Sequence, residues 1–267
     1  MAQGNAPRLR RREPRRYIGT DMLKIIGLLL TVQGTVGVAL LQNGLLNMGG
    51  QTRLELWDLI QTDQNAAQVL AWSVLSKGMV SLAWPIFAYL AVEGLQNTSS
   101  FPRYALRLLI TALVSEVPYD LAMSGKWVDW SSQNFLFSLL IGLVALYMVQ
   151  EVAEARENGR ALQVLFPVGA VLWTFLFQTQ LGILVVLAMT AMYFLRERPL
   201  WRDILVAVLG LATIPASLSV LLIHFHRPGP TMFPKWIYYA AYPIQLLAIG
   251  LIGYFLQIGR ASCRERV

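Results

Sequence analysis

Cysteine, histidine and charged residues are all scarce in this sequence. Its 267 residues include one cysteine, two histidines and only 14% charged side chains. The single cysteine, Cys263, excludes an internal disulfide framework and a cysteine-rich metal site. Two histidines without further cysteine do not predict a metal site, so we expect none. G-x-S-x-G, P-loop and H-E-x-x-H motifs are also absent, so no familiar hydrolase, nucleotide-binding or metalloprotease chemistry is indicated.

What the sequence has in abundance is apolar side chains, at 56% of all residues. They occur in blocks of roughly 20, the length that crosses the hydrocarbon core of a bilayer. We therefore predict an all-α fold, a polytopic transmembrane helical bundle of about eight spans. The fifth and sixth blocks are short and are joined only by "QTQ", which suggests a tight hairpin or a re-entrant pair. The blocks are residues 22–41, 66–92, 104–123, 134–152, 162–177, 181–195, 204–223 and 235–256.

Positive charge is distributed unevenly between the loops. With the N-terminus inside, sixteen Lys and Arg residues fall on inner segments and four on outer loops, with Lys24 and Lys77 inside spans. This asymmetry is the positive-inside pattern, and it predicts that both termini are cytoplasmic. The net charge of +7 is then a matter of topology and lipid headgroups, so we expect the bilayer as partner and no nucleic acid.

The same pattern predicts the division of the chain. We expect a basic cytoplasmic N-terminal segment at residues 1–21 and a single transmembrane domain at residues 22–257. The tail at residues 258–267 is expected to be non-native or a short cytoplasmic extension.

Two carboxylates interrupt the third apolar block in the stretch "VSEVPYD". Ionisable groups at membrane depth are rare and are functional candidates. Glu116 and Asp120 are four residues apart and share a helix face, and Pro118 between them frees a backbone carbonyl. Lys77 in the second block is the obvious cationic partner, and a Lys77–Glu116 ion pair is the structural alternative to catalysis.

Further polar residues fall at similar depth or at the outer ends of the predicted spans. "SQN" and "QTQ" contribute amides at the outer ends, Gln245 enters from the last block, and "HFHRPG" places His224 and His226 in a predicted outer loop. Together they would line a cavity open to the outer side, although ordinary interhelical hydrogen bonding explains any one of them equally well. We predict catalytic roles for Glu116, Asp120, His224 and His226. Substrate binding is predicted for Lys77, Glu93, Gln133, Asn134, Gln180 and Gln245.

Several segments together resemble the TraX family, membrane proteins linked to N-acetylation of conjugative pilin and related to larger transmembrane acyltransferases. Their order and spacing match from about residue 23 to residue 256. The segments are "LKII" at 23–26, "WPIFAYLAVEGLQNT" at 84–98, "RYALRLLITALVSEVPYDLAMSGK" at 103–126, "QNFLFSLLIGLVAL" at 133–146 and "IYYAAYPIQLL" at 237–247.

The sequence departs from the family pattern at its titratable positions. Gly34 and Thr35 stand where the family usually has an Asp-His pair, and Asn97 and Gln245 stand where it commonly has histidines. Gln180 replaces an aspartate. The imidazole that would serve as the general base is therefore missing. Glu116 or Asp120 would replace it, His224 or His226 would reach in from a loop, or acetyl transfer has been lost.

The resemblance implies an integral protein of the bacterial cytoplasmic membrane. Its expected activity is transfer of an acetyl or acyl group from acetyl-CoA to an amine or hydroxyl of a pilin-like peptide, glycan or lipid acceptor. Arg103, Arg107 or Arg156 would contact the CoA phosphates. The alternative is a catalytically degenerate relative that acts as a binding or assembly component. A transporter is a more distant third reading, because no internal repeat of the kind that transporters show is visible.

Overall fold

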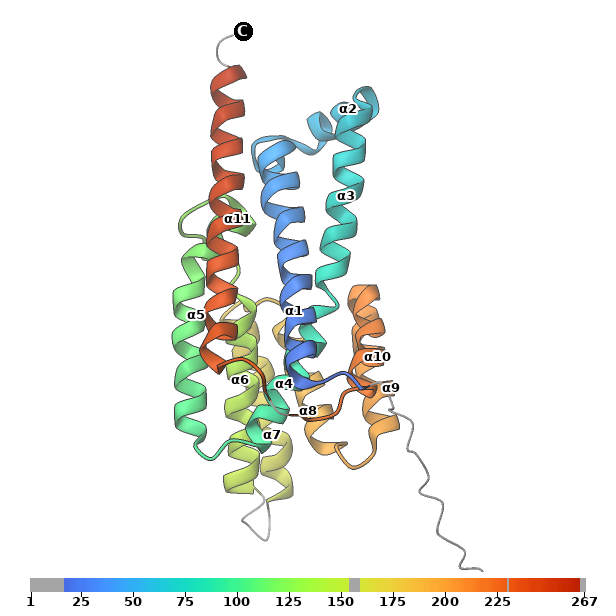
Figure 1. Cartoon of the computed structure of the whole chain (residues 1–267), viewed down its shortest axis with the longest axis vertical. Helices are drawn as coiled ribbons and strands as arrows, with labels where there is room; N and C mark the ends of the chain where they lie inside the picture. Colours follow the sequence, from blue (N-terminus) through green and yellow to red (C-terminus); the bar gives the residue numbers. More distant parts are fainter. Residues whose placement is uncertain (1–16, 154–158, 230, 265–267) are drawn as a thin grey trace, which may run out of the picture.

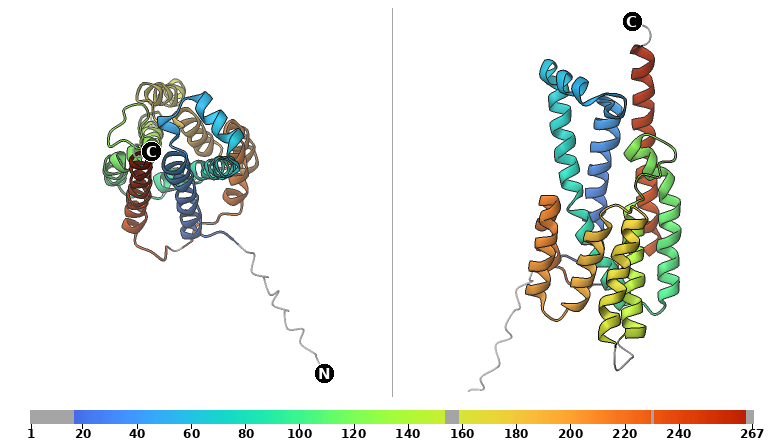
Figure 2. Two further views of the ribbon diagram at one scale, coloured as in Figure 1. Left: turned by 90° about the horizontal axis from the view of Figure 1, so that it is seen from above. Right: turned by 180° about the vertical axis from the view of Figure 1, so that it is seen from behind.

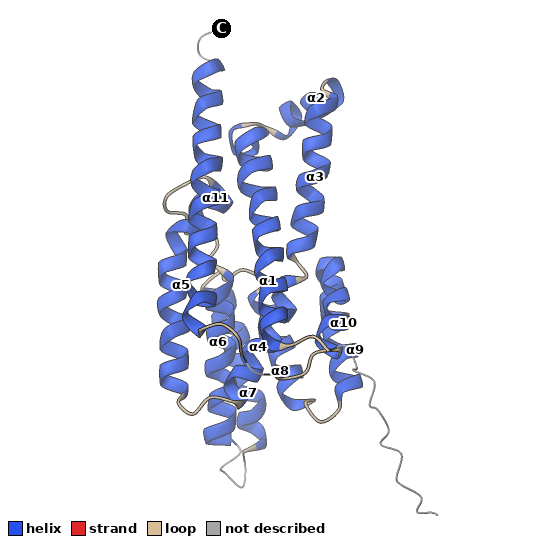
Figure 3. Cartoon of the chain, viewed as in Figure 1, coloured by secondary structure: helices blue, strands red, loops and turns tan. Residues whose placement is uncertain are grey.

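The computed structural model describes residues 17–153, 159–229 and 231–264, and in these ranges it is helical, with two isolated β-bridges and no strand ladder (Figures 1 and 3). The expectation of an all-α fold is confirmed. The elements are α1 (Thr20–Thr35), η1 (Val36–Leu45), η2 (Met48–Gly50), α2 (Arg53–Thr62), α3 (Gln64–Val80), α4 (Ala83–Gln96), α5 (Phe101–Ser124), α6 (Phe135–Met148), η3 (Val149–Ala153), α7 (Arg160–Leu176), α8 (Gly182–Phe194), α9 (Pro199–Gly210), η4 (Leu211–Leu218), α10 (Ser219–His224) and α11 (Lys235–Arg264).

The long helices are held together by close contacts between small residues. α11 runs beside α5 and η1, and α3 packs on α1 and η1 (Figures 1 and 2). A Cβ added at Gly253 would lie 2.3 Å from the carbonyl oxygen of Ala39, and one at Gly37 would lie 2.5 Å from Cβ of Ser76. In membranes, where apolar burial gives no advantage over lipid, such close backbone approach supplies much of the attraction between helices.

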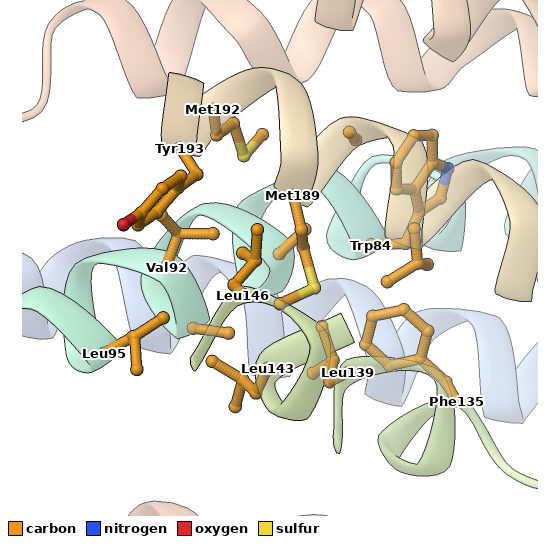
Figure 4. Close-up of a cluster of buried hydrophobic side chains, with 14 of the residues drawn as sticks. Trp84, Val92, Leu95, Phe135, Leu139, Leu143, Leu146, Met189, Met192 and Tyr193 are labelled. Atoms are coloured by element: carbon orange, nitrogen blue, oxygen red, sulfur yellow. The ribbon is translucent and has the colours of Figure 1, made fainter. Parts of the chain in front are cut away.

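The largest buried cluster lies among the shorter helices α4, α6 and α8 (Figure 4). Leu143 of α6 and Met189 and Val185 of α8 have no exposed surface, and Trp84 of α4 is 2% exposed. These helices begin or end at mid-height of the bundle, where the turn after α7 meets the start of α6 through a bridge between Gln133 and Thr179. The fifth and sixth predicted blocks are thus confirmed as a pair of short helices joined by a tight turn.

We call one end of the bundle the basic end. The start of α5, the start of α7 and the α8–α9 turn all lie there (Figure 1), and these segments carry Arg103, Arg160 and Arg196. The other end, where α2 lies, is the opposite end.

The seventh predicted span does not cross the bundle but folds back on itself. The backbone is non-helical at Thr213 and Ile214, between α9 and α10. Nδ1 of His224 at the end of α10 lies 2.7 Å from Oδ2 of Asp203 at the start of α9. A continuous helix would separate these residues by about 30 Å. α9 and α10 therefore form a re-entrant hairpin, and both of its ends face the basic end.

The prediction of about eight spans is only partly supported. By length and composition, five segments of the described residues qualify as spans, and one of them, Pro199–His224, is the broken hairpin. α5 is 24 residues long but is too charged to qualify, because it carries Arg103, Arg107, Glu116 and Asp120. Helices of this kind define a membrane protein.

The hairpin also reverses the predicted position of the last helix. α1 and α11 both start toward the basic end and run in the same direction (Figure 1), and Ile18 pairs with His226 just before each helix begins. α11 therefore ends at the opposite end of the bundle. The start of α1 and the end of α11 thus lie toward opposite ends of the bundle, because the seventh block doubles back, and this arrangement gives no support to the prediction that both termini are cytoplasmic. Residues 1–16, Arg156 and residues 265–267, on which other predictions were based, lie outside the described residues.

The hairpin can be tested by labelling with a membrane-impermeant maleimide in a Cys263→Ser background. Phe225 follows α10 and is 58% exposed. Phe225→Cys is expected to react from the same side of reconstituted vesicles as Arg198→Cys, and Lys126→Cys from the other side. Reaction of Phe225→Cys and Lys126→Cys from a common side would restore a straight seventh span.

Candidate functional site

A cavity of about 260 Å³ lies between the start of α1, α4, the first half of α5, the start of α6 and the start of α11. It reaches toward the basic end. Its walls are formed by two kinds of side chain, cationic or phenolic on one part and apolar on the other. The lining residues are Lys24, Leu28, Phe87, Leu90, Ala91, Gly94, Asn97, Thr98, Tyr104, Arg107, Leu108, Thr111, Phe135, Leu136, Leu139, Lys235, Tyr238, Tyr239 and Tyr242.

Three cations from three helices reach the cavity, and no carboxylate lines it. They are Lys24 of α1, Arg107 of α5 and Lys235 at the first position of α11. Lys24 is 3.5 Å from Asp21, and its ammonium lies 4.6 Å from the ring centre of Tyr238. The cavity therefore carries a net positive charge, which attracts anionic ligands.

Four tyrosines give the cavity a polar wall, three of them from the first two turns of α11. Tyr238, Tyr239 and Tyr242 come from α11, and Tyr104 comes from α5. The Tyr104 hydroxyl donates to the carbonyl oxygen of Ala91 at 3.4 Å. Gly94 makes room for it, because a Cβ there would lie 2.8 Å from the hydroxyl oxygen.

The side facing α4 and α6 is apolar. Phe87, Leu108, Phe135 and Leu139 line it, and the Phe87 and Phe135 ring centres are 6.3 Å apart. A cavity that joins cations to an apolar wall suits a ligand with a charged head and an uncharged body.

Glu116 lies further along α5 than the residues that line the cavity, and Asn134 holds it there. Oε2 of Glu116 accepts the backbone N–H of Asn134 at 3.3 Å and also the Asn134 side-chain amide. Oε1 is buried and has no hydrogen-bond partner. Glu116 lies close enough to Tyr119 and Tyr242 to interact with both electrostatically. One carboxylate oxygen is thus fixed, while the other is free for chemistry.

Asp120 has a structural role in this arrangement. Its Oδ2 accepts the backbone N–H of Asp129 at 2.9 Å, which fastens the loop after α5 back onto that helix. It does not line the cavity. The position of the loop, which the sequence left open, is what separates Asp120 from the site.

The amides predicted to bind substrate are mainly structural. Asn134 is fully buried, caps α6 by accepting from Leu136 N–H, and donates to the carbonyl of Ala112. Gln133 forms the backbone bridge to the α7–α8 turn. The side chain of Gln180 in that turn is exposed. None of these three residues lines the cavity.

His224 and His226 lie toward the basic end and not in an outer loop. His224 contacts Asp203, as described above. The His226 side chain is completely buried, with Nδ1 3.2 Å from the Tyr89 hydroxyl and Nε2 3.8 Å from Oε2 of Glu93. Its burial, followed by the nearby Arg202 guanidinium, lowers the pKa of His226 below the usual value of 6.5. Neither histidine lines the cavity, nor does Glu93.

The predicted Lys77–Glu116 pair does not form. Lys77 is exposed on α3, and no ion pair to it occurs within the described ranges. α3 turns this side chain away from α5. Groups of three or more His, Cys, Asp or Glu side chains that would hold a metal ion are likewise absent from the part of the chain that the structure describes.

Of the positions where the chain departs from the family pattern, Thr35 and Gln245 meet at Thr31, with Gly34 next to Thr35, whereas Asn97 and Gln180 lie elsewhere. Gln245 donates to the Thr31 hydroxyl at 3.0 Å, and the hydroxyl of Thr35 donates to the Thr31 carbonyl. Asn97 lines the cavity at its other end. Gly34 is packed so tightly that a Cβ would lie 2.3 Å from Cβ of Val80. An aspartate at Gly34 therefore does not fit this packing.

Sequence reasoning missed the cavity's lysines and tyrosines as site residues. Lys24 was present in "LKII", and Tyr238, Tyr239 and Tyr242 in "IYYAAYP", both of which were used only for the resemblance. The available signal was the coincidence of a lysine one turn into the first span with a cluster of tyrosines at the start of the last. Of the three arginines proposed for CoA phosphates, Arg107 lines the cavity and Arg103 does not.

The fold and cavity define a helical integral membrane protein with a cationic cavity at one end of its bundle. The model of the family described as "TraX protein" matches residues 20–253 of the sequence. The chain belongs to the TraX family. Neither a curated protein nor a solved structure matches it.

The stability of Glu116 variants tests the corrected pairing. Glu116→Gln keeps the side-chain shape, and the cost is set by the changed contacts with Asn134, at roughly 1–3 kcal/mol. Because Lys77 is not the partner, adding Lys77→Met to Glu116→Gln is expected to shift the detergent unfolding temperature by the same amount as adding it to the wild type. Asn134→Ala should cost at least as much as Glu116→Gln, because it also removes the cap of α6. A larger upward shift in Glu116→Gln than in the wild type would establish the ion pair instead.

The buried imidazole predicts a pH dependence of stability. Since the pKa of His226 is depressed in the folded protein, the unfolded chain binds more protons below about pH 6.5. The stability due to the neutral imidazole is complete above that pH and falls as the pH decreases toward the folded pKa. We expect a lower melting temperature at pH 5.5 than at pH 7.5, and a smaller difference for His226→Gln. An equal difference in both proteins would contradict this assignment.

Proposed function

We propose that this TraX family member is a membrane-embedded acyltransferase that uses acetyl-CoA. In this proposal the basic end of the bundle faces the cytoplasm of a bacterium and receives the donor. The acceptor is an amine or hydroxyl of a peptide, glycan or lipid that approaches through the membrane or from its outer side. The observation that carries the proposal is a cavity with three cations whose wall residue Tyr242 interacts electrostatically with Glu116, a buried carboxylate with one oxygen lacking a hydrogen-bond partner.

The residues present fit such a donor. Lys24, Arg107 and Lys235 supply charge and hydrogen bonds for phosphate oxygens. The tyrosine hydroxyls offer partners for the amides of the pantetheine arm, and the opposite wall is apolar. At about 260 Å³ the cavity is slightly smaller than the roughly 300–1,000 Å³ of typical ligand sites. It would therefore hold the thioester arm and leave the nucleotide at the mouth.

Glu116 is the base in this proposal. The acceptor nitrogen or oxygen attacks the thioester carbonyl carbon while Oε1 of Glu116 takes its proton. The tetrahedral intermediate then releases the CoA sulfur as the C–S bond breaks, and the proton passes to that sulfur. The Tyr242 hydroxyl, which lines the cavity and interacts electrostatically with Glu116, is the proposed donor for the developing oxyanion. Asn134 is a positioning residue in this proposal, because it holds Oε2 and leaves Oε1 without a hydrogen-bond partner.

A second candidate function has its own supporting observation. Gly34 cannot be replaced by the family's aspartate without displacing Val80, and no histidine lines the cavity. A degenerate relative would bind the same anionic ligand and transfer nothing. This reading predicts binding of CoA thioesters without thioester loss.

Arg107 and Arg103 provide a matched pair for testing donor binding. Both are exposed arginines one turn apart on α5, but only Arg107 lines the cavity. We expect Arg107→Gln to weaken acetyl-CoA binding roughly tenfold or more, as for loss of a charged hydrogen bond, and Arg103→Gln to have little effect. Isothermal titration of the detergent-solubilised protein measures both. Equal effects would mean that the arginines act only through overall charge.

Glu116→Gln separates the two candidate functions. For an acyltransferase, this variant should bind acetyl-CoA normally but lose turnover by about 100-fold or more, as expected when a general base is removed. Free thiol release with a small amine acceptor reports the reaction. Binding without turnover in the wild-type protein itself would support the degenerate relative, and an unchanged rate in Glu116→Gln would remove Glu116 from the mechanism.

A further inference from the structure

Lys77 is a charged side chain without a partner on a membrane-spanning helix. It lies near the middle of the continuous apolar segment Gln64–Gln96. The side chain is exposed, and within the described ranges no ion pair reaches it. An ammonium at this depth is costly unless it is paired, and lysines near helix ends avoid that cost by reaching the surface. Lys77 lies in the last turn of α3, but α4 continues the same apolar segment to Gln96, so both ends of the segment are more than a dozen residues away.

The surface around Lys77 is an apolar face of α3 that is bounded on one side by the tip of the α9–α10 hairpin. Val74, Lys77 and Gly78 share one face of α3 through their spacing of three and four residues, and Val74 is 57% exposed. Gly78 lies beside Pro215 at the tip of the α9–α10 hairpin. A Cβ added at Gly78 would be 3.7 Å from Cγ of Pro215. The hairpin ends at the lower part of α3 (Figures 1 and 2).

The tip of the hairpin continues this apolar surface. Ile214 is 76% exposed, and Leu211 and Leu218 are each 60% exposed. The other face of α3 is already used, because Ser73 and Ser76 receive hydrogen bonds from Gln42 and Gln33. The free face of α3 therefore has the form of a site for one more helix, with a single positive charge in it.

We propose that this surface binds a transmembrane helix of another protein that carries a carboxylate at mid-membrane depth, paired with Lys77. The half-crossing hairpin leaves the space beside α3 that a full span would otherwise occupy. Anionic lipid is a poorer match, because phosphate headgroups lie at the membrane surface while Lys77 lies deep. The proposal concerns a different surface from the cavity and does not depend on acyl transfer.

A second copy of this chain is also a poorer match. The exposed carboxylates of the described residues lie on α2 and the turn after it or at the α6–α7 and α8–α9 connections, and the half-buried Asp129 lies on the loop after α5. Asp129 accepts the backbone N–H of Ser131 and lies beside α5, away from α3. Pairing it with Lys77 of another copy would give a head-to-tail contact that continues without closing.

The test uses designed leucine–alanine helices in phosphatidylcholine vesicles. One helix carries a central glutamate and the other a glutamine, and each is labelled at one end. Energy transfer to a fluorophore on Cys263 of the full-length protein reports binding. The glutamate helix should bind roughly 3- to 30-fold more tightly than the glutamine helix, the range of polar contacts between helices in membranes. Lys77→Met should remove this preference, Lys77→Arg should keep it, and Lys126→Met serves as the control.

Several outcomes would overturn the proposal. These are equal binding of the two helices, a glutamate preference that survives in Lys77→Met, and loss of helix binding when phosphatidylglycerol is added, which would make lipid the occupant. Self-association that disappears in Lys77→Met would assign the surface to a second copy. Because Lys77 has no partner to lose, Lys77→Met should melt at or above the wild-type temperature. If it melts lower, Lys77→Gln is measured as well. A glutamate preference that persists in Lys77→Gln would also overturn the proposal.

Discussion

The buried hydrogen bonds of Asn134 are the constraint on which the rest of this structure depends. This one side chain caps α6, donates to a carbonyl of α5 and holds one oxygen of Glu116. It therefore fixes the start of α6 at the middle of α5 and not at its end. The residues that follow it, Phe135 and Leu139, become a wall of the cavity for the same reason. A buried amide with all these partners is costly to disturb, since each lost partner leaves a polar group unpaired.

The half-crossing hairpin is the second constraint, because it decides which ends of the helices meet. By returning the chain to the basic end, it starts α11 beside the start of α1, where Oδ2 of Asp21 accepts the N–H groups of Met232 and Phe233. Lys24 and Lys235 then face one cavity, although 211 residues separate them. With a straight seventh span, the tyrosines of α11 would begin at the opposite end, and no cavity with this charge would form.

Some of the site could be read from residues, and some could not. The isolation of Glu116 in an apolar block was visible, because a carboxylate at that depth has few explanations. Its partner was not visible, because a helical bundle could bring either Lys77 or Asn134 to Glu116. Only the packing of the helices decides which of the two lies there. Asp120 was indistinguishable from Glu116 by sequence, and its contact with the Asp129 N–H depends on how a loop folds back. The departures at Gly34 and Gln245 were visible as substitutions, but their consequence depends on Val80 and Thr31 across the helix contacts.

The sequence by itself determined that this chain is helical, that it belongs in a membrane and that it is a TraX family member. Apolar block length, the scarcity of charge and the spacing of matching segments are local properties, and they do not change with the path of the chain. The tertiary structure decided that the seventh block doubles back, at which end of the bundle α1 and α11 begin, and which residues share a cavity. Hydropathy cannot distinguish one full crossing from two half-crossings, because both bury the same apolar residues. The break at Thr213 and Ile214 is stabilised by contacts to Ser81 and Trp84 from a distant helix, and the block's hydropathy does not reveal them.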